Sequence, residues 1–367
     1  MGLSIGIVGL PNVGKSTLFN ALTKAQNASS ANYPFCTIEP NKAIVPVPDS
    51  RLERLSEIVK PRKSTPAVVE FIDIAGLVKG ASQGEGLGNQ FLANIREVDA
   101  IVHVLRCFED DDIAHVHGEV DPIQDMEIIE TELILADLQN MERKAEKLQK
   151  QTKSGDKKVQ ALLKEVQKLI THLGQGKPAS TFEGKNTELM TAVYKEHGLL
   201  TSKEMILCAN VQEHQVNTPP ELVEKLYRHA DRRGLPVITI SAKMEEELAE
   251  LEDEEREEFL SSYAISESGI DQVIRTGYDI LGLTSFFTAG PKEVRAWTVK
   301  KGSKAPQAAG AIHSDFQRGF IRAEVIKFED YMRMGSELKC KEKGLMSVQG
   351  KDYQVCDGDV IHFLFNV

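Results

Sequence analysis

The chain has 367 residues, more than one hydrophobic core usually holds, so two or three domains are expected. Its 41% hydrophobic content is that of a globular protein, and no apolar run reaches the ~20 residues of a membrane span, so we expect no membrane segment. The net charge of −11 comes largely from residues 245–258, which hold ten acidic residues and one arginine and are interpreted as the solvated face of a helix.

A phosphate-binding loop of the pattern G-x-x-x-x-G-K-[ST] stands at residues 9–16. It follows an apolar run of strand length at residues 3–8 and precedes a helix-period pattern at residues 17–24. Lys15 is expected to reach the β- and γ-phosphates as a solvent-facing cation, and the Ser16 hydroxyl to hold Mg²⁺. The expected nucleotide contacts in this loop are Asn12, Val13, Gly14, Lys15, Ser16 and Thr17.

Two later segments have the positions of nucleotide-sensing switch loops. Thr37 lies in a polar, proline-punctuated stretch before a predicted edge strand at residues 42–47 and is a candidate second hydroxyl ligand of Mg²⁺, although a loop threonine is often only a turn residue. Asp73 ends a β-branched apolar run and opens a D-x-x-G element. Such an aspartate binds Mg²⁺ through water, while the Gly76 N–H meets the γ-phosphate, so Lys15, Thr37 and Gly76 are the predicted transition-state contacts.

Leu77 stands directly after this element, where Ras-like hydrolases place a glutamine that orients the attacking water. Leucine has no hydrogen-bonding group, so a cation or a partner protein must supply that role. Asn12 either offers an oxygen to a monovalent cation or satisfies the loop backbone. Considered as bases, His103 in an apolar run is typical of a satisfied core residue, and His115 and His117 of a surface loop.

The base-reading element is altered relative to GTPases. A strand at residues 204–209 ends in Asn210-Val211-Gln212-Glu213, where GTPases have N-K-x-D. In that element the aspartate accepts from the guanine N1–H and exocyclic amine, and the lysine packs on the base. Val211 stands in place of the lysine and Glu213 in place of the aspartate, so both interactions that select guanine are lost. An asparagine can meet the acceptor and donor of adenine, which favours Asn210 as a reader of ATP, with a helix N-cap as the alternative role. Ser241 and Ala242, after a predicted strand at 236–240, have the position of the last base-cradling loop.

Two long helical patterns separate the halves of this nucleotide domain. Residues 125–151 and 156–173 both carry apolar residues at alternating steps of three and four, and residues 154–156 supply a turn, so we expect an antiparallel coiled-coil hairpin. Residues 141–177 contain ten Lys or Arg against four Asp or Glu. Contact with RNA phosphates and a solvated face with no partner both explain these charges.

At these motifs the chain resembles the YchF subfamily of the Obg-related P-loop proteins, the Obg-like ATPases, over nearly its whole length. The matching segments are residues 9–16, 32–41, 73–89 and 210–213. Residues 283–367 resemble the small TGS domain of threonyl-tRNA synthetase and stringent-response enzymes. The resemblance implies preference for ATP over GTP, slow hydrolysis with a hydrophobic residue at Leu77, Mg²⁺ at Ser16 and Thr37, and potassium stimulation through Asn12. It also implies association with a ribosomal subunit or the 70S ribosome, and it favours rRNA contacts by the lysine-rich hairpin and the TGS domain.

The predicted fold is α/β: a P-loop NTPase domain of the Ras-like type, with an inserted antiparallel coiled-coil domain and a small α+β, β-grasp-like TGS domain. Expected boundaries are residues 1–124 and 200–282 for the nucleotide-binding domain, 125–199 for the insertion and 283–367 for the TGS domain. The last is expected to combine short strands with one helix, with Trp297 either in its core or stacked on a base, and with His313, Arg318 and Arg322 in packing and surface roles.

Five cysteines are scattered without a C-x-x-C pair and are interpreted as reduced thiols of a cytoplasmic protein, each a small buried hydrophobe. They are Cys36, Cys107, Cys208, Cys340 and Cys356.

Three functions fit this sequence. The first is an ATPase that binds ATP and ADP and whose turnover switches affinity for the ribosome. The second is a nucleotide-gated ribosome- or RNA-binding module in which hydrolysis is incidental, and the third is a GTPase of the same fold.

Overall fold

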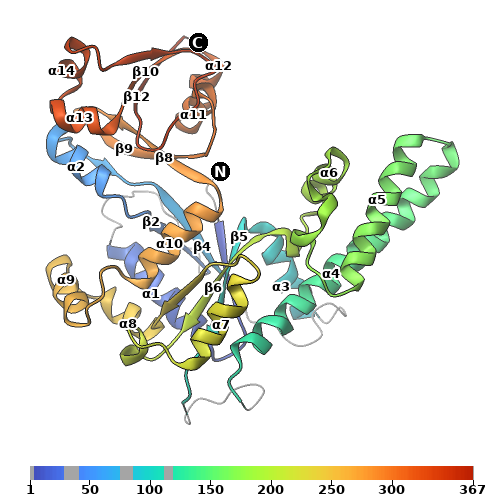
Figure 1. The fold of residues 1–367 in the computed structure, drawn as a ribbon. Helices are drawn as coiled ribbons and strands as arrows, with labels where there is room; N and C mark the ends of the chain where they lie inside the picture. The colour runs from blue at the N-terminus through green and yellow to red at the C-terminus, as the bar shows by residue number, and fades with distance from the viewer. Residues whose placement is uncertain (1–3, 29–40, 75–85, 111–118, 367) are drawn as a thin grey trace. The chain divides into compact units, whose positions relative to one another are not determined.

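A computed structural model describes residues 4–28, 41–74, 86–110 and 119–366 (Figure 1). The predictions for Thr37, Gly76, Leu77, His115 and His117, and the one for Cys36, lie outside these residues. The chain forms two compact units, one of Leu3–Ala21 with Phe71–Gly269 and one of Leu22–Glu70 with Ile270–Val367. In the described residues, none of the helices is both apolar enough and long enough to cross a membrane.

A six-stranded sheet has the order β2-β4-β1-β5-β6-β7. Its strands are β1 (Ser4–Val8), β2 (Lys42–Pro46), β4 (Val68–Asp73), β5 (Ala100–Arg106), β6 (Glu204–Asn210) and β7 (Val237–Ile240). Strands β1, β5, β6 and β7 pair in parallel, and β5 is buried at every position, as expected for a central strand covered on both faces. The α/β fold and the edge position of the strand predicted at residues 42–47 are confirmed.

The helices of this part include the one predicted directly after the phosphate-binding loop. They are α1 (Lys15–Ala28), α3 (Gly86–Glu97), α7 (Glu221–Asp231), α8 (Ala242–Leu248), α9 (Asp253–Ser262) and α10 (Gly269–Ile280). Residues 245–258 do not form one solvated helix face, because they divide between α8 and α9. Glu245 is buried, and its Oε1 accepts a hydrogen bond of 2.7 Å from the Gly269 N–H at the start of α10.

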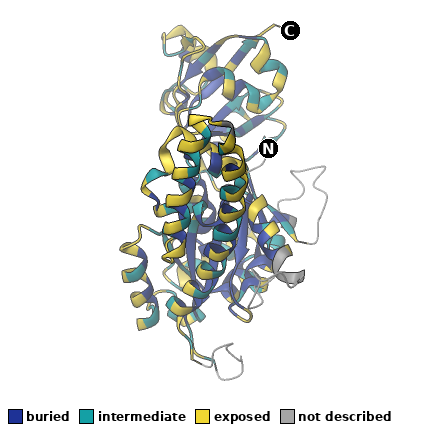
Figure 2. Ribbon diagram, turned by 90° about the vertical axis from the view of Figure 1, so that its right-hand side faces the viewer, coloured by how far each residue is buried: buried dark blue, intermediate teal, exposed yellow. Residues whose placement is uncertain are grey.

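The predicted coiled-coil hairpin is present. Helices α4 (Pro122–Gln151) and α5 (Lys157–Gly174) run side by side, with Gly155 in the left-handed region (φ 76°) at the turn and Asp156 capping α5 (Figure 1). The predicted seam residues are buried or half-buried between them, and exposed residues cover the outer faces (Figure 2). Residues 178–199, including α6 (Glu188–His197), complete this core in a way that the sequence pattern did not indicate.

A buried carboxylate ties this hairpin to the returning chain. Asp137 on α4 is 1% exposed. It accepts hydrogen bonds from the Leu200 N–H (2.9 Å), the Thr201 N–H (2.9 Å) and the Thr201 hydroxyl (2.7 Å). Burial raises the pKa of Asp137, and these three donors oppose the shift. The three contacts fix where the chain leaves the hairpin and enters β6.

The second sheet has the order β11-β10-β12-β8-β9-β3. Its strands are β8 (Leu283–Ala289), β9 (Val294–Lys300), β10 (Phe320–Ile326), β11 (Ser347–Gln349), β12 (Val360–Phe365) and β3 (Ser64–Thr65). Strand β3 comes from far upstream and pairs in parallel with β9, and α2 (Ser50–Val59) precedes it. The sequence pattern gave no indication of this pairing.

Four helices, and not the one predicted, accompany these C-terminal strands in the described residues. They are α11 (Ala305–Ile312), α12 (Ser314–Arg318), α13 (Phe328–Met334) and α14 (Glu337–Glu342). Each is eight residues or shorter, too short to display a helical period in the sequence. Trp297 is half-buried against this core, donates to the Thr288 hydroxyl (2.9 Å) and carries the Arg295 guanidinium over its ring.

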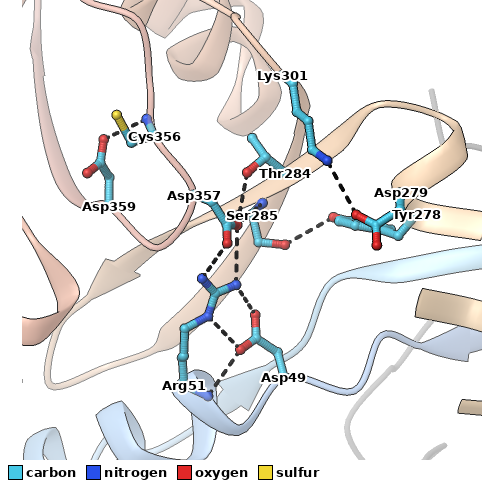
Figure 3. A network of polar contacts seen from close by, with 10 residues as sticks. All are labelled: Asp49, Arg51, Tyr278, Asp279, Thr284, Ser285, Lys301, Cys356, Asp357 and Asp359. Atoms are coloured by element: carbon cyan, nitrogen blue, oxygen red, sulfur yellow. Dashed lines mark hydrogen bonds and ion pairs between the residues drawn. The ribbon is translucent and has the colours of Figure 1, made fainter. Parts of the chain in front are cut away.

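The start of α2 joins the C-terminal strands through the Arg51 guanidinium (Figure 3). Arg51 Nε donates to Asp49 Oδ1 (2.9 Å) and Nη1 donates to Asp357 Oδ2 (2.6 Å). Asp357 Oδ1 also accepts from the Thr284 hydroxyl (2.9 Å) and the Ser285 N–H (3.2 Å). Burial opposes ionisation of Asp357, but the donors, Arg51 first among them, outweigh it and lower its pKa.

The expectation that each cysteine is buried is wrong at one of the four described positions. Cys107, Cys208 and Cys340 are buried, whereas Cys356 is exposed and its thiol has only a weak contact with the Gln354 carbonyl oxygen. Burial raises the pKa of the Cys107 and Cys208 thiols, which makes them unreactive at neutral pH. The surface role expected of His313 and Arg318 is confirmed, since both side chains are largely exposed.

Candidate nucleotide-binding site

The phosphate-binding loop has the backbone that its sequence predicts. Strand β1 ends at Val8 and α1 begins at Lys15, so residues 9–14 form the connection that precedes the helix N-terminus. Asn12 and Gly14 have positive φ (63° and 101°). A Cβ at Gly14 would lie 2.2 Å from Asn210 Nδ2, so only glycine fits between the loop and β6.

Lys15 is not the solvent-facing cation that the sequence suggested. Its side chain is 9% exposed, and its Nζ donates to the Leu10 carbonyl oxygen at 2.7 Å. Burial lowers the pKa of Lys15, and the nearby Asp73 carboxylate opposes that shift. The ammonium is therefore held inside the loop, and two of its three donors remain for a bound anion.

Asp73 lies beside Lys15 at the end of β4. Burial raises the pKa of Asp73 and Lys15 opposes the shift, while the buried Oδ1 has no hydrogen-bond partner within the described residues. Those residues contain no group of three His, Cys, Asp or Glu side chains able to hold a metal. An orphaned carboxylate oxygen together with the exposed Ser16 hydroxyl suits a hard cation that takes its remaining ligands from phosphate and water, which is how Mg²⁺ binds.

His103 is buried in the sheet as expected, but it is not satisfied. It is 0% exposed, and neither ring nitrogen has a hydrogen-bond partner among the residues that the structure describes. Burial, with a smaller contribution from Lys15, lowers the pKa of His103 to about 3. The imidazole is therefore neutral at physiological pH.

Asn210 joins the loop to the base-side elements. Its Nδ2 donates to the Val13 carbonyl oxygen (2.9 Å) and its Oδ1 accepts from the Ala242 N–H (2.9 Å). The alternative of a helix N-cap is wrong for Asn210 itself, because Ser241 caps α8, yet Asn210 does satisfy one N-terminal donor of that helix. One N–H and one lone pair of the amide remain for a ligand.

A cavity of about 910 Å³ lies against these residues, within the usual size range of ligand pockets. It is lined by Asn12, Gly14, Lys15, Ser16, Thr17, Phe108, Asp110, Asn210, Val211, Gln212, Glu213, His214, Ser241, Ala242, Lys243 and Glu246. The predicted contacts Asn12, Gly14, Lys15, Ser16, Thr17, Asn210, Val211, Ser241 and Ala242 are thus brought together. Val13 contributes its carbonyl to Asn210 and is itself buried.

Two features of this cavity were missed by sequence reasoning. Arg106, fully buried at the end of β5, donates from Nε to the Phe108 carbonyl oxygen and from Nη2 to that of Asp110, both at 3.0 Å, and so positions two lining residues. Glu213 Oε1 and Lys243 Nζ form an ion pair at 2.9 Å on the base side. The sequence did carry a signal for Arg106, because an arginine ends an otherwise apolar strand run. It carried no signal for the ion pair, because Glu213 and Lys243 are thirty residues apart.

Replacing Asn210 by alanine is expected to lower the unfolding free energy by about 1–2 kcal/mol, because the Ala242 N–H and the Val13 carbonyl both lose a buried partner. Binding of ADP and GDP should both weaken, since the loop itself is loosened, and ADP should lose more, since the variant also removes the amide atoms that remain for adenine. Urea denaturation and calorimetric titration measure the two effects. His214→Ala, at an exposed position of the same cavity, is the matched control, and equal stability of the two variants would contradict the bridging role.

Comparison with known proteins matches this arrangement along the whole chain. Residues 4–210 match a family model described as a 50S ribosome-binding GTPase, and residues 283–366 match the YchF-GTPase C-terminal family, described as a protein of unknown function. The ribosome-binding ATPases YchF of Bacillus subtilis and Haemophilus influenzae are each 53% identical, over 100% of this chain and of each relative. The solved structure of the Schizosaccharomyces pombe YchF GTPase is 38% identical, covers 99% of this chain and 98% of its own, and superposes with a TM-score of 0.90.

The bacterial relatives are thus named as ATPases and the yeast structure as a GTPase. Identity above half, full coverage of both sequences and a matching fold leave one assignment: this chain is a member of the YchF family.

Proposed function

We propose that this protein binds ATP, hydrolyses it slowly to ADP and phosphate, and associates with the ribosome according to the nucleotide bound. The proposal rests on one observation: Lys15 of the phosphate-binding loop and the altered element at residues 210–213 line the same cavity. Ribosome binding and ATP hydrolysis are the functions in the names of the bacterial relatives.

The phosphates would lie at the α1 N-terminus, where backbone N–H groups of the loop and the Lys15 ammonium converge. Ser16 would coordinate Mg²⁺ directly and Asp73 would hold it through water, in keeping with the unpartnered Asp73 Oδ1. Mg²⁺ bound there would neutralise charge that develops between the β- and γ-phosphates. We retain Thr37 as second metal ligand, Gly76 as γ-phosphate contact, and a K⁺ site at Asn12 as proposals.

Adenine would lie on the base side against Asn210 and Val211. The Asn210 amide keeps one N–H for the acceptor N7 and one lone pair for the exocyclic amine, which is the pairing that asparagine makes with adenine elsewhere. Ser241 and Ala242 fix the opposite wall at the start of α8. Selection of adenine therefore needs no carboxylate, in contrast to selection of guanine.

Contact with ribosomal RNA would use the α4–α5 hairpin and the C-terminal domain. Several lysines of the hairpin helices are exposed, among them Lys147, Lys150, Lys157, Lys158 and Lys164. Charges so placed release counterions on binding phosphate backbones, so the affinity should fall steeply with salt. This proposal also includes the cytoplasm as location, the domain ranges 1–124, 125–199, 200–282 and 283–367, and the TGS assignment of the last of them.

Co-sedimentation with ribosomes in ATP, ADP and no nucleotide tests the proposal, together with single-turnover hydrolysis with and without ribosomes and K⁺. We expect nucleotide-dependent binding, a low basal rate because Leu77 cannot orient water, and acceleration by one of the two additions. A variant with Lys147, Lys150, Lys157 and Lys158 changed to Gln should lose ribosome affinity while it keeps ATP affinity. Binding that ignores the nucleotide and hydrolysis that neither addition accelerates would contradict the switch, and a Kd favouring GTP would favour the alternative of a GTPase.

A further inference from the structure

The carboxylate at the guanine-reading position of this cavity already has a partner. Glu213 stands three residues after Asn210, where the N-K-x-D element of GTPases has its aspartate. Its Oε1 lies 2.9 Å from Lys243 Nζ, and both side chains line the cavity. Lys243 stands at the second position of α8, directly after the Ala242 N–H that Asn210 holds.

The backbone fixes both ends of this ion pair. Glu213 begins a short 3-10 turn that is capped reciprocally by Gln212 and Gln215, and the Gln212 N–H donates to Gln215 Oε1 at 3.1 Å. On the other side, Ser241 caps α8 and Asn210 anchors its first residue. The carboxylate is 29% exposed and the lysine 73% exposed, so the pair faces the ligand side and not the protein interior.

Guanine and adenine make opposite demands on such a carboxylate. Guanine presents N1–H and an exocyclic amine, two donors that a free carboxylate accepts. Adenine presents a lone pair at N1, which a free carboxylate repels. A carboxylate neutralised by an ammonium loses most of its attraction for guanine and most of its repulsion of adenine.

We propose that Lys243 is a specificity-determining residue of the nucleotide site, because it neutralises Glu213 and thereby disfavours guanine and admits adenine. This inference rests on the proposed ATP-binding function and deepens it. The hydrogen bond to Glu213 raises the pKa of Lys243, so the ammonium stays charged across physiological pH. Glu247, on the same helix, and Tyr263 also interact electrostatically with Lys243 and raise its pKa further.

The test is Lys243→Met, which keeps the aliphatic stem and removes the charge, with Kd values for ADP, GDP and IDP from calorimetry. We expect the ratio of GDP to ADP affinity to rise about tenfold or more, the size of one charge-assisted hydrogen bond gained. IDP lacks the exocyclic amine and should gain less than GDP. Lys243→Arg keeps an ion pair and should keep the wild-type ratio, and Lys243→Met with Glu213→Gln should cancel the gain.

Lys225→Met is the matched control, because Lys225 forms a comparable exposed pair with Glu221 at 3.1 Å on α7 and does not line the cavity. An unchanged GDP to ADP ratio in Lys243→Met, or an equal change in Lys225→Met, would overturn the inference. A wild-type chain that binds GDP more tightly than ADP would instead contradict the proposed function. The wild-type ratio and the variant ratio thus report on the two claims separately.

Discussion

Lys15→Ala is expected to weaken binding of MgADP and of a non-hydrolysable ATP analogue at least about hundredfold, the loss of two charge-assisted hydrogen bonds to phosphate. The fold should survive this substitution. Lys15 is buried and its pKa is lowered by that burial, so the folded state disfavours this charge even though Leu10 accepts from it.

Calorimetric titration measures the loss of affinity, and far-UV circular dichroism with thermal melting checks the fold. Lys158→Ala, at an exposed position of the hairpin, removes a cation without touching the cavity and serves as control. An affinity within threefold of wild type would show that Lys15 does not contact phosphate. A melting temperature far below wild type would show that the Lys15–Leu10 contact stabilises the loop.

Asp137→Ala is expected to lower the unfolding free energy by about 3 kcal/mol, because three donors lose a buried, ionisable acceptor at once. Two of these donors are the backbone N–H groups of Leu200 and Thr201, which cannot turn to another partner. The segment at Leu200 and Thr201 would then no longer be held against α4, so the hairpin should become more sensitive to proteases.

Urea denaturation of wild type, Asp137→Ala and Asp156→Ala measures this effect. Asp156 is the exposed N-cap of α5, and its removal should cost about 1 kcal/mol, so the difference between the two variants isolates the effect of burial. Since burial raises the pKa of Asp137 above its unfolded value, the carboxyl contributes less to stability as the pH rises from the unfolded pKa to the folded one. Equal losses for the two variants would contradict the structural role of Asp137.

The parts of this molecule that could be predicted from sequence are those encoded by a local period or a fixed spacing. The loop at residues 9–16 and the apolar run of β5 belong to this class, because neighbouring residues alone determine them. The hairpin seam does too, since residues such as Leu148 and Val166 follow a regular step and are buried as expected. Among the residues on the base side of the cavity, Asn210 was found by comparison with the N-K-x-D element of GTPases, and Ala242 by its position in the last base-cradling loop.

The parts that could not be predicted depend on contacts between residues distant in sequence. Arg51 meets Asp357 across 306 positions, and Asp137 meets Thr201 across 64. A polar residue has no period, so nothing marks such a pair before the fold brings it together. Burial of Glu245 was missed for the same reason, because its partner is the Gly269 N–H at the start of a later helix. Burial of Lys15 was missed for a different reason: its partner Leu10 is only five positions away, but a contact with a backbone carbonyl leaves no mark in the sequence.

The pairing of β3 with the edge strand β9 determines which fragments of the protein can be produced on their own without an unpaired strand edge. A piece that begins at Leu283, where the C-terminal family model begins, would lack Ser64 and Thr65 and leave the β9 backbone groups unpaired. It would also lack Arg51, which stacks over Phe287 and neutralises Asp357. Exposed strand edges recruit other chains, so such a fragment should self-associate, whereas one with residues 41–70 supplied in trans should remain monomeric.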